Sequence, residues 1–396
     1  MIPFNKPFLT GKETEYISQA VADGKLSGNG AYTKKCQEFF EKRYGFGKAL
    51  MTTSCTDALE MAAILSGVKP GDEVIVPSYT FVSSALAFVR QGCRIVFADS
   101  CTDNPNIDPD KIESLVTERT RVIVPVHYAG VACDMDRIMD IARRHDLIVV
   151  EDAAQAVDSF YKGRPLGSIG HMGCFSFHET KNIIAGEGGL LTINDPRFVR
   201  RSEIIWEKGT NRSEFFRGEV NKYGWVDTGS SFLPSELVSA FLWAQIENLE
   251  AVQARRKAIW EQYREGFAPL AERGFMTLPD IPDYATNNAH MFYIVCRSLQ
   301  ERTQLIKYLK DNGILAVFHY LSLHRSAFYT SHPEHRPASL DKTVPDGDER
   351  VVVGLDLPNC DHFADCLLRL PMFYELTDAQ QAFIIDNVNE FFAARQ

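Results

Sequence analysis

The apolar positions in the first half of this chain follow two different spacings. Short, continuously apolar runs, such as residues 73–79, 93–99 and 147–155, alternate with segments like 135–145, in which apolar residues recur every three or four positions. Buried parallel strands produce runs of the first kind, and amphipathic helices produce the second spacing. The pattern predicts an α/β fold whose larger part is a doubly wound, mainly parallel sheet.

The same criteria place the other elements of this half. A short apolar run leads into residue 181, and residues 190–195 are expected to form an antiparallel edge strand. A further strand is predicted at 121–127, and helices are predicted at 13–22, 32–44, 58–65 and 80–91.

The second half begins with a long stretch of helical spacing from Pro234 to about Glu272. A helix of that length would outrun one domain, so we place a hinge inside it, between a large domain (1–248) and a smaller C-terminal α/β domain (249–396). The smaller domain is expected to contain strands at 290–296 and 315–320, a helix at 302–312 and a final helix from residue 378. A polar insert at 331–361, with one apolar island at 351–353, has no assigned role.

Composition narrows the classes of function. The net charge of −10 argues against a nucleic-acid surface, and no apolar run reaches the roughly 18 residues that a membrane span needs. The amino terminus lacks the basic and apolar regions of a secretory signal peptide. The nine cysteines are scattered without a CxxC pair, which indicates free thiols in a reducing compartment and no metal site. We expect a cytoplasmic protein without membrane or nucleic-acid partners.

Lys181 is the first candidate for a catalytic residue. It follows a short apolar run and precedes a glycine-rich turn at residues 186–189. Burial at such a place disfavours the ammonium form, lowers the pKa and frees an amine that can form a Schiff base. The competing interpretation is a surface lysine beside a turn, and the local sequence does not decide between the two.

Two other positions point to an anion and a cation as ligands. Cys55 and Thr56 stand at the start of a predicted helix, where free amides and the helix dipole attract an anion, although a plain N-cap is the commoner use of such residues. Asp152 follows a buried-looking strand, where an unpaired carboxylate is costly. It needs a protonated nitrogen as partner, or it caps the next helix.

These positions fit one chemistry when they are taken together. Ligands of parallel sheets collect at the carboxyl ends of strands, where His127, Asp152, Gln155 and the segment before Lys181 are all expected. A phosphate site at Thr56, a carboxylate for a protonated ring nitrogen and an imine-forming lysine are the requirements of pyridoxal 5′-phosphate (PLP). No G-x-G-x-x-G follows the first strand, so a dinucleotide fold has little support.

Five segments carry a further signal, and in chain order they are TSCTDALEMA, PGDEVIVPSYTFVSS, VPVHYAG, VEDAAQA and SFHETKNIIAGEGG. They resemble the DegT/DnrJ/EryC1/StrS sugar aminotransferases, and the resemblance runs over nearly the whole chain. The resemblance implies a fold-type-I, aspartate-aminotransferase-like homodimer with active sites at the subunit interface. It also implies a ping-pong reaction in which L-glutamate supplies the amino group for a nucleotide-linked keto-sugar, with TDP-4-keto-6-deoxy-D-glucose as the first candidate.

The resemblance assigns roles to individual residues. Lys181 would hold PLP as a Schiff base and then shuttle protons between C4′ and the substrate carbon. Asp152 would hold the pyridinium proton, Gln155 would contact the ring hydroxyl, and Phe81 would stack on the ring. The phosphate would lie among Cys55, Thr56 and Ser176. The implied substrate contacts are His127, Lys208, Arg212, Arg217, His319 and Tyr320, and His178 fits either a binding or a structural role.

The chain departs from the family at one point. Many relatives have an Asn in a G-Y-N segment that reaches the phosphate of the partner subunit, whereas this chain reads GSSFLPSEL, with Ser231 as the substitute. Three alternatives stay open at this stage. A dehydratase of the same fold would carry His in place of Lys181, a related aminotransferase would accept a free keto-sugar acid such as a keto-octulosonic acid, and a cofactor-binding regulator would have no turnover.

Overall fold

The computed structural model describes residues 1–337, 340 and 355–394. A seven-stranded sheet forms its centre, with the strand order β1-β9-β8-β5-β4-β2-β3. The strands from β8 to β3 are parallel, whereas β9 runs antiparallel to both of its neighbours. The bounds are β1 Lys48–Thr52, β2 Glu73–Pro77, β3 Arg94–Ala98, β4 Thr120–Ile123, β5 Ile148–Asp152, β8 Met172–Ser176 and β9 Gly189–Ile193.

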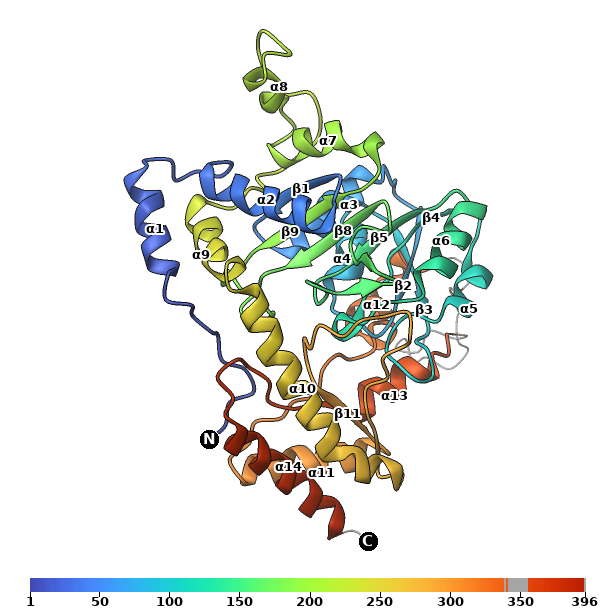
Figure 1. Ribbon diagram of the computed structural model, residues 1–396. Coiled ribbons are helices and arrows are strands. Elements are labelled where there is room, and N and C mark those ends of the chain that lie inside the picture. Colours follow the sequence, from blue (N-terminus) through green and yellow to red (C-terminus); the bar gives the residue numbers. More distant parts are fainter. Residues whose placement is uncertain (338–339, 341–354, 395–396) are drawn as a thin grey trace.

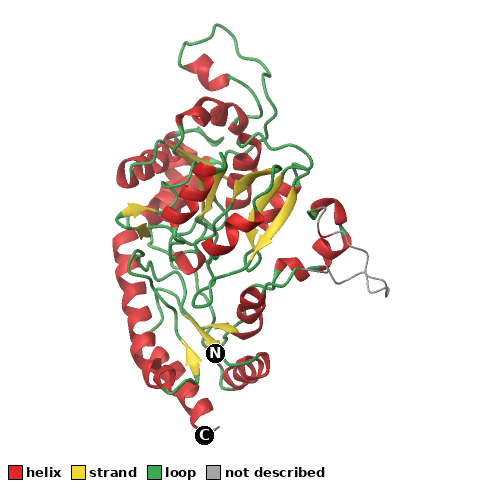
Figure 2. Ribbon diagram, turned by 90° about the vertical axis from the view of Figure 1, so that its right-hand side faces the viewer, coloured by secondary structure: helices red, strands yellow, loops and turns green. Residues whose placement is uncertain are grey.

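Helices cover both faces of this sheet (Figures 1 and 2). Alternate residues of one strand enter different apolar clusters: Val74 and Val76 of β2 pack in one cluster, and Ile75 packs in the other. Burial on two faces explains why these strands are continuously apolar in the sequence. The helices of this region are α1 Glu13–Ala22, α2 Ala31–Tyr44, α3 Cys55–Leu65, α4 Ser83–Val89, α5 Pro109–Ile112, α6 Met135–Arg144, α7 Pro196–Trp206, α8 Arg212–Phe216 and α9 Glu236–Ile246.

The structure corrects the sequence analysis at two strands of the large sheet. The residues of β1 were not predicted as a strand, yet they form the edge of the sheet by pairing with β9, with Leu50 opposite Leu191. Strand β9 is antiparallel as expected, but it lies inside the sheet, between β1 and β8. The order of strands depends on which chain segments meet in space, and a local hydrophobic pattern does not contain that information.

The long helical stretch is interrupted. Helix α9 ends at Ile246, and a second helix, α10 (Leu249–Glu272), begins after residues 247–248. Beyond it, α11 (Leu299–Asp311) and α14 (Asp378–Ala393) enclose a third apolar core with a small antiparallel sheet. That sheet has the order β10-β11-β12, with β10 Met276–Thr277, β11 Tyr293–Cys296 and β12 Leu367–Arg369. The division at residues 248 and 249 stays a prediction, and it coincides with the start of α10.

The region after α11 differs from the expected strand at 315–320. These residues are irregular and join the sheet only through the isolated bridge between Val317 and Arg369. The apolar island of the predicted insert, residues 351–353, lies outside the described residues. The remaining elements are α12 Ala327–Ser331, α13 Pro358–Cys366 and a two-stranded ribbon of β6 Phe160–Tyr161 and β7 Arg164–Pro165.

Glu236 connects the amino-terminal segment to the main body of the structure. It is buried at the start of α9 and accepts hydrogen bonds from the amides of Gly30, at 2.9 Å, and Tyr32, at 2.7 Å. These amides belong to the first turn of α2, which has no side-chain cap of its own. The carboxylate of Glu236 therefore acts as a cap supplied from another helix, and it fixes the turn at residues 24–30 over α9.

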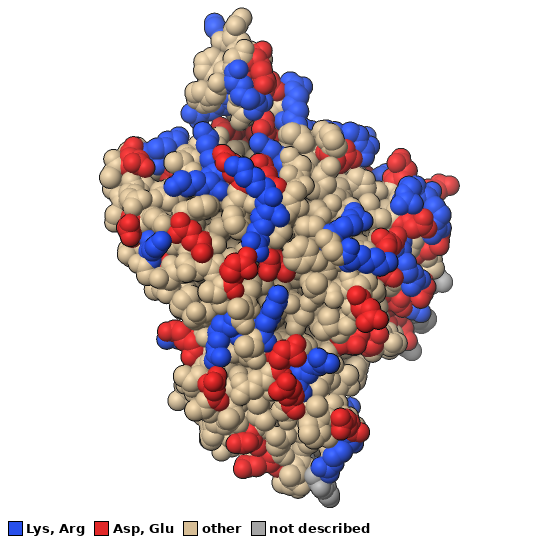
Figure 3. All heavy atoms as spheres, in the orientation of Figure 1, with Lys and Arg blue, Asp and Glu red and all other residues tan. Residues whose placement is uncertain are grey.

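The charged side chains visible on the face drawn in Figure 3 include both signs, interspersed over the whole view. Within the described part of the chain, no helix has both the length and the apolar character of a membrane span.

Candidate functional site

A cavity of about 550 Å³ lies at the carboxyl ends of β4, β5 and β8, where the large sheet meets the region around β12. Its walls include His127 after β4, Asp152 at the end of β5 and Ser176 at the end of β8. This is the place where parallel sheets gather ligands. Eleven of the residues named from the sequence line it: Cys55, Thr56, Phe81, His127, Asp152, Gln155, Ser176, His178, Lys181, His319 and Tyr320.

Asp152 is buried in the wall of this cavity. Its Oδ2 accepts a hydrogen bond from Ser84 Oγ at 2.6 Å, and its Oδ1 accepts one from the amide of Ala154 at 3.1 Å. Burial raises the pKa of the carboxyl, while these bonds and the charge of Lys181 oppose the rise. Among the described residues no cationic side chain lies within 4.0 Å of it. A buried carboxylate without a cation fits the protonated ring nitrogen of PLP.

Lys181 faces the same cavity from the loop after β8. Its amide donates to the carbonyl of His178 at 2.9 Å, which fixes the backbone, but its Nζ makes no hydrogen bond or ion pair with any described residue. Burial lowers the pKa of this lysine, and the charge of Arg369 adds to the effect, whereas Cys55 and Asp152 oppose it. An unbonded amine in a cavity, with its pKa lowered by burial, loses its proton more easily, and the neutral form is suited to nucleophilic attack on an aldehyde.

The amino terminus of α3 forms another wall. Ser54 caps the helix by accepting the amide of Asp57 at 3.1 Å, which leaves the amides of Cys55 and Thr56 without an intrahelical acceptor. The hydroxyl of Thr56 lies 2.8 Å from that of Ser83. A helix start with unused amides and nearby hydroxyls is suited to a phosphate group.

Close packing holds this helix start in place. A Cβ added to Gly189, the first residue of β9, would lie 2.4 Å from the carbonyl carbon of Ser54 and 2.5 Å from the amide nitrogen of Cys55. Both contacts are with backbone atoms, which cannot swing away as a side chain can. Glycine at this position therefore lets the strand touch the helix terminus at the cavity wall.

A hydrogen-bonded group of side chains forms another part of the cavity wall. Gln155 accepts the amide of Ala129 at 2.6 Å and donates to the hydroxyl of Tyr320 at 3.0 Å. The rings of Tyr320 and His319 are stacked, with their centroids 3.5 Å apart. His319 Nδ1 is 2.7 Å from the hydroxyl of Tyr128, and burial lowers the pKa of the imidazole well below its usual value. His319 is therefore uncharged at neutral pH and hydrogen bonds as a neutral ring.

His127 lines the cavity, but both of its ring nitrogens are engaged within the chain. Nε2 lies 2.9 Å from Glu151 Oε2, and Nδ1 accepts the amide of Cys133 at 3.2 Å. Glu151 also accepts the amides of Gly167, Ile169 and Gly170. Glu151 thus connects His127 to the loop at residues 167–170. Neither imidazole nitrogen is left to bond a substrate, so the geometry of one chain does not support the predicted substrate contact of His127.

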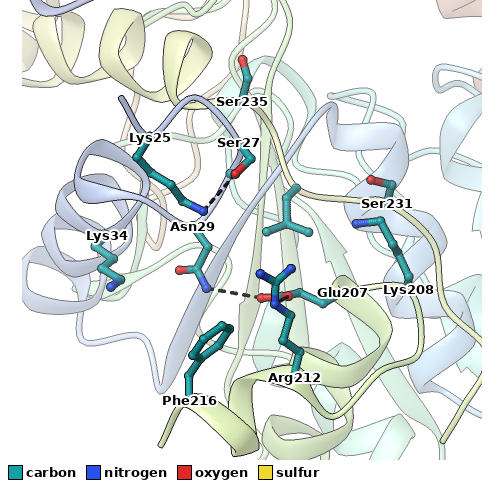
Figure 4. Close-up of a pocket in the computed structure, with 12 residues that line it drawn as sticks. Lys25, Ser27, Asn29, Lys34, Glu207, Lys208, Arg212, Phe216, Ser231 and Ser235 are labelled. Carbon is teal, nitrogen blue, oxygen red and sulfur yellow. Dashed lines mark hydrogen bonds and ion pairs between the residues drawn. The ribbon is translucent and has the colours of Figure 1, made fainter. Parts of the chain in front are cut away.

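The loop residues named from the sequence lie elsewhere. Lys208, Arg212 and Ser231 line a second cavity of about 510 Å³, together with Lys25, Lys34 and Glu207 (Figure 4). Arg217 lines neither this cavity nor that of Lys181, because it pairs with Glu203 at 2.8 Å and Glu219 at 2.7 Å. Within one chain, then, the fold does not bring these residues to Lys181.

Sequence reasoning missed Ser84, His290 and Arg369. Ser84 stands inside the segment PSYTFVSS, four residues after Thr80, and the two hydroxyls are 2.9 Å apart. The sequence shows where Ser84 stands, but it does not show that Asp152 is its partner. His290 and Arg369 reach the cavity from around the small sheet. No local pattern marks either of them, because only the packing of the two regions brings them to the site.

Comparison with known proteins agrees with this geometry. The model of the DegT/DnrJ/EryC1/StrS aminotransferase family matches residues 7–389. The spore coat polysaccharide biosynthesis protein SpsC of Bacillus subtilis (strain 168) is 30% identical over 396 residues, covering 98% of this chain and 96% of that protein. The GDP-perosamine synthase of Caulobacter vibrioides is 33% identical over 320 residues, covering 79% and 83% of the two chains.

A solved structure is similar over its whole length. The putative sugar aminotransferase Spr1654 from Streptococcus pneumoniae, in its PMP-form, has a TM-score of 0.87 with 25% sequence identity, and the match covers 99% of each chain. The fold, the unbonded lysine and the buried carboxylate without a cation fit the cofactor of such enzymes. This chain therefore belongs to the DegT/DnrJ/EryC1/StrS aminotransferase family and is a PLP-dependent sugar aminotransferase of fold type I.

Proposed function

We propose that this enzyme transfers the amino group of L-glutamate to a keto-sugar carried on a nucleotide, with TDP-4-keto-6-deoxy-D-glucose as the first candidate. The observation that carries the proposal is the presence, in one cavity, of the Lys181 amine and the buried Asp152 carboxylate. The printed name of GDP-perosamine synthase supports a nucleotide-linked sugar as the class of substrate. The name of SpsC supports a product that enters a surface polysaccharide.

The residues of the cavity have separate tasks in this proposal. PLP, when bound, supplies the electron sink that stabilises negative charge on the reacting carbon. Lys181 Nζ holds the cofactor, takes the proton from the α-carbon of the donor and later returns a proton to the sugar carbon. Asp152 keeps the ring nitrogen protonated, and Phe81, which lines the cavity with more than half of its surface exposed, covers a face of the ring.

Other residues of the cavity wall contact the phosphate, the ring hydroxyl and the sugar in this proposal. The first-turn amides of α3, with Thr56 and Ser176, hold the phosphate. Gln155 lies beside the ring hydroxyl, and His319 and Tyr320 contact the sugar from the opposite side.

We also propose a homodimer whose active sites are shared. The segment around α8 projects from the body of the molecule (Figure 1), and Trp225 in it is 82% exposed, with Phe216 and Tyr223 also exposed. Large exposed aromatic side chains of this kind are typical of protein interfaces. In the dimer, this segment brings Lys208, Arg212 and Ser231 to the cavity of the partner subunit, where Ser231 contacts the phosphate.

A related aminotransferase acting on a free keto-sugar acid is the second candidate, because a cavity with Lys25, Lys34, Lys208 and Arg212 suits a carboxylate as well as a diphosphate. Both candidates are placed in the cytoplasm, where the nine free cysteines stay reduced.

The visible absorption spectrum of the purified enzyme with PLP tests the proposal. We expect a yellow band that disappears when L-glutamate converts the cofactor to its pyridoxamine form, and that returns when the correct keto-sugar is added. A panel of nucleotide-linked keto-sugars and free keto-sugar acids then identifies the acceptor. Lys181→Ala should fold normally and show no turnover. Full turnover by that variant, or no yellow band after PLP is added to the wild type, would contradict the assignment of Lys181.

A further inference from the structure

His290 is a buried histidine in the wall of the Lys181 cavity to which the sequence analysis assigned no role. It precedes β11 of the small sheet, and 7% of its surface is exposed. Its Nδ1 lies 2.9 Å from the side-chain oxygen of Asn182, the residue that follows Lys181. The imidazole is therefore attached to the loop that carries the reactive amine.

The hydrogen bonds of Asn182 determine which ring nitrogen of His290 carries a hydrogen. The Nδ2 of Asn182 donates to the backbone carbonyl of Asn288 at 2.8 Å and to the side-chain oxygen of Gln253 at 2.7 Å. A backbone carbonyl only accepts, so the amide nitrogen of Asn182 lies on that side and its oxygen faces His290. Because that oxygen also only accepts, Nδ1 of the imidazole is the donor and carries a hydrogen.

The other ring nitrogen, Nε2, is left without a hydrogen. Burial lowers the pKa of His290 well below its usual value, and the positive charge of Lys181 adds to the effect. The ring is therefore uncharged at neutral pH, and its Nε2 keeps a lone pair that accepts hydrogen bonds. Among the described residues Nε2 has no hydrogen-bond partner, and it is not fully buried. The structure thus presents an unpaired acceptor in the cavity that Lys181 also lines.

The proposed reaction creates a need for such an acceptor. When Lys181 takes the proton of the α-carbon, the C–H bond breaks, its electron pair passes to the bound cofactor, and the amine becomes an ammonium group. An ammonium group has three N–H donors, and its charge is costly in a buried cavity unless these donors are paired. Asp152 serves the ring nitrogen of the cofactor in this proposal, so the ammonium group needs a different acceptor.

A neutral imidazole suits this task because it is a weaker base than the amine of a lysine. It orients the ammonium group without removing the proton that must return to the sugar carbon. A carboxylate in its place would stabilise the ammonium form more strongly, raise the pKa of Lys181 and slow the return of the proton.

We propose that His290 accepts, through Nε2, a hydrogen bond from the protonated amine of Lys181 and holds that amine in place between the two proton transfers. His290 is a positioning residue, because it acts through Lys181 and exchanges no proton itself. The inference rests on the proposed role of Lys181 as the proton carrier of both half-reactions.

Two substitutions at this position separate the roles of the two ring nitrogens. His290→Asn keeps an N–H group for Asn182 but has no atom at the position of Nε2, whereas the longer His290→Gln places an amide oxygen near that position. In the His290→Asn holoenzyme, the maximal rates of band bleaching by L-glutamate and of band return with the keto-sugar should both fall roughly 10- to 100-fold, the loss typical of a charged hydrogen bond. The half-maximal concentrations should change less than about threefold, and His290→Gln should recover part of the rate.

An isotope effect distinguishes this role from a structural one. Glutamate that carries deuterium on its α-carbon should slow bleaching more, relative to ordinary glutamate, in His290→Asn than in the wild type, because proton transfer then limits the rate. His171 supplies the matched control. Burial lowers its pKa as well, and its Nδ1 accepts the amide of Val149 at 2.9 Å, but it does not line the cavity. His171→Asn should leave both half-reactions unchanged.

The hydrogen on Nδ1 can be tested without turnover. Nitrogen NMR of the cofactor-free enzyme with isotope-labelled histidine should show, at neutral pH, one ring with a protonated Nδ1 and a bare Nε2 whose signals are absent from both His290→Asn and His290→Gln. A hydrogen on Nε2 of this ring would overturn the inference.

Two kinetic outcomes would also overturn it. One is unchanged rates and isotope effect in His290→Asn. The other is a loss confined to the sugar half-reaction, which would place Nε2 against a hydroxyl of the sugar. If another amino acid bleaches the wild type and L-glutamate does not, the proposed donor is wrong, and the same comparison with that amino acid tests His290. The failure of one proposal is thus distinguishable from the failure of the other.

Discussion

The hydroxyl of Ser84 donates to Asp152 at 2.6 Å, and this hydrogen bond links the first turn of α4 to the carboxyl end of β5. Ser84 has no exposed surface, and its hydroxyl also lies 2.9 Å from that of Thr80. The bond therefore orients the buried carboxylate toward the cavity and lowers its pKa against the effect of burial.

Removing this donor should weaken cofactor binding. We expect Ser84→Ala to raise the dissociation constant for PLP roughly tenfold, because a hydrogen bond to a charged group contributes about 1.5–3 kcal/mol and water replaces part of it. Titration of the cofactor-free enzyme, followed by the visible band, measures this constant. Ser66→Ala is the control, since Ser66 bonds the carbonyl of Ala62 at the far end of α3. Equal losses in the two variants would argue against a specific role for Ser84.

The pKa of Asp152 leads to a prediction about stability. Because burial raises this pKa above 3.8, ionisation costs the folded state more than the unfolded state. The contribution of Asp152 to stability is thus complete below pH 3.8 and is lost as the pH rises through the folded-state pKa. At neutral pH we expect Asp152→Asn to stabilise the cofactor-free enzyme by about 1–2 kcal/mol while it weakens the retention of PLP.

Urea unfolding of cofactor-free wild type and Asp152→Asn at a series of pH values from about 4 to 8 measures this effect. The difference between their free energies of unfolding should grow in favour of the variant as the pH rises. A difference that does not depend on pH would mean that the Asp152 carboxylate is not destabilised by burial.

The pKa of Lys181 leads to a prediction about the capture of the cofactor. Only the neutral amine attacks the aldehyde of PLP, and burial lowers the pKa of Lys181 below 10.5. The rate at which the visible band forms should therefore rise with pH and level off below the pKa of a free lysine. Stopped-flow absorbance over a range of pH values provides the measurement. A rate that continues to rise through pH 10.5 would show an ordinary, solvated ammonium group at this position.

Gly189 should be intolerant of any side chain. The Cβ of Gly189→Ala would meet backbone atoms of Ser54 and Cys55 at 2.4–2.5 Å, so the start of α3 must move. We expect a loss of about 1–3 kcal/mol in the free energy of unfolding and a larger loss of phosphate affinity than of stability. For Gly188→Ala the added Cβ would meet only side-chain atoms, the nearest at 3.3 Å, and its effect should be smaller. Thermal unfolding and PLP titration of both variants make the comparison.

The shared active site can be tested by mixing subunits. Lys181→Ala and the double variant Lys208→Ala with Arg212→Ala should each be nearly inactive, for different reasons. If the two groups of residues act in the same site from different subunits, then mixed dimers contain one intact site of two. Random exchange makes half of the dimers mixed, so the activity should return to about a quarter of the wild-type value. No recovery after verified subunit exchange would place both groups in the same subunit or exclude the loop from the site.

Much of the large sheet follows from local pattern. We predicted β2, β3 and β5 because a strand that is buried on both faces is continuously apolar. We predicted α6 because a helix that is buried on one face repeats its apolar residues every three or four positions. Lys181 and Asp152 were recognisable because each follows an apolar run, where a polar residue is unusual. Thr56 was recognisable because it stands at the start of a predicted helix, where free amides attract an anion.

Tertiary structure alone decided which of these residues meet. The edge position of β1, the engagement of His127 by Glu151 and the pairing of Ser84 with Asp152 depend on contacts between distant segments. The same holds for Arg369, which reaches the cavity as part of the small sheet. A hydrophobic pattern records whether a residue is buried, because burial is a property of one position. It does not record the neighbours of that residue, because these are set by how the packed elements are arranged in space.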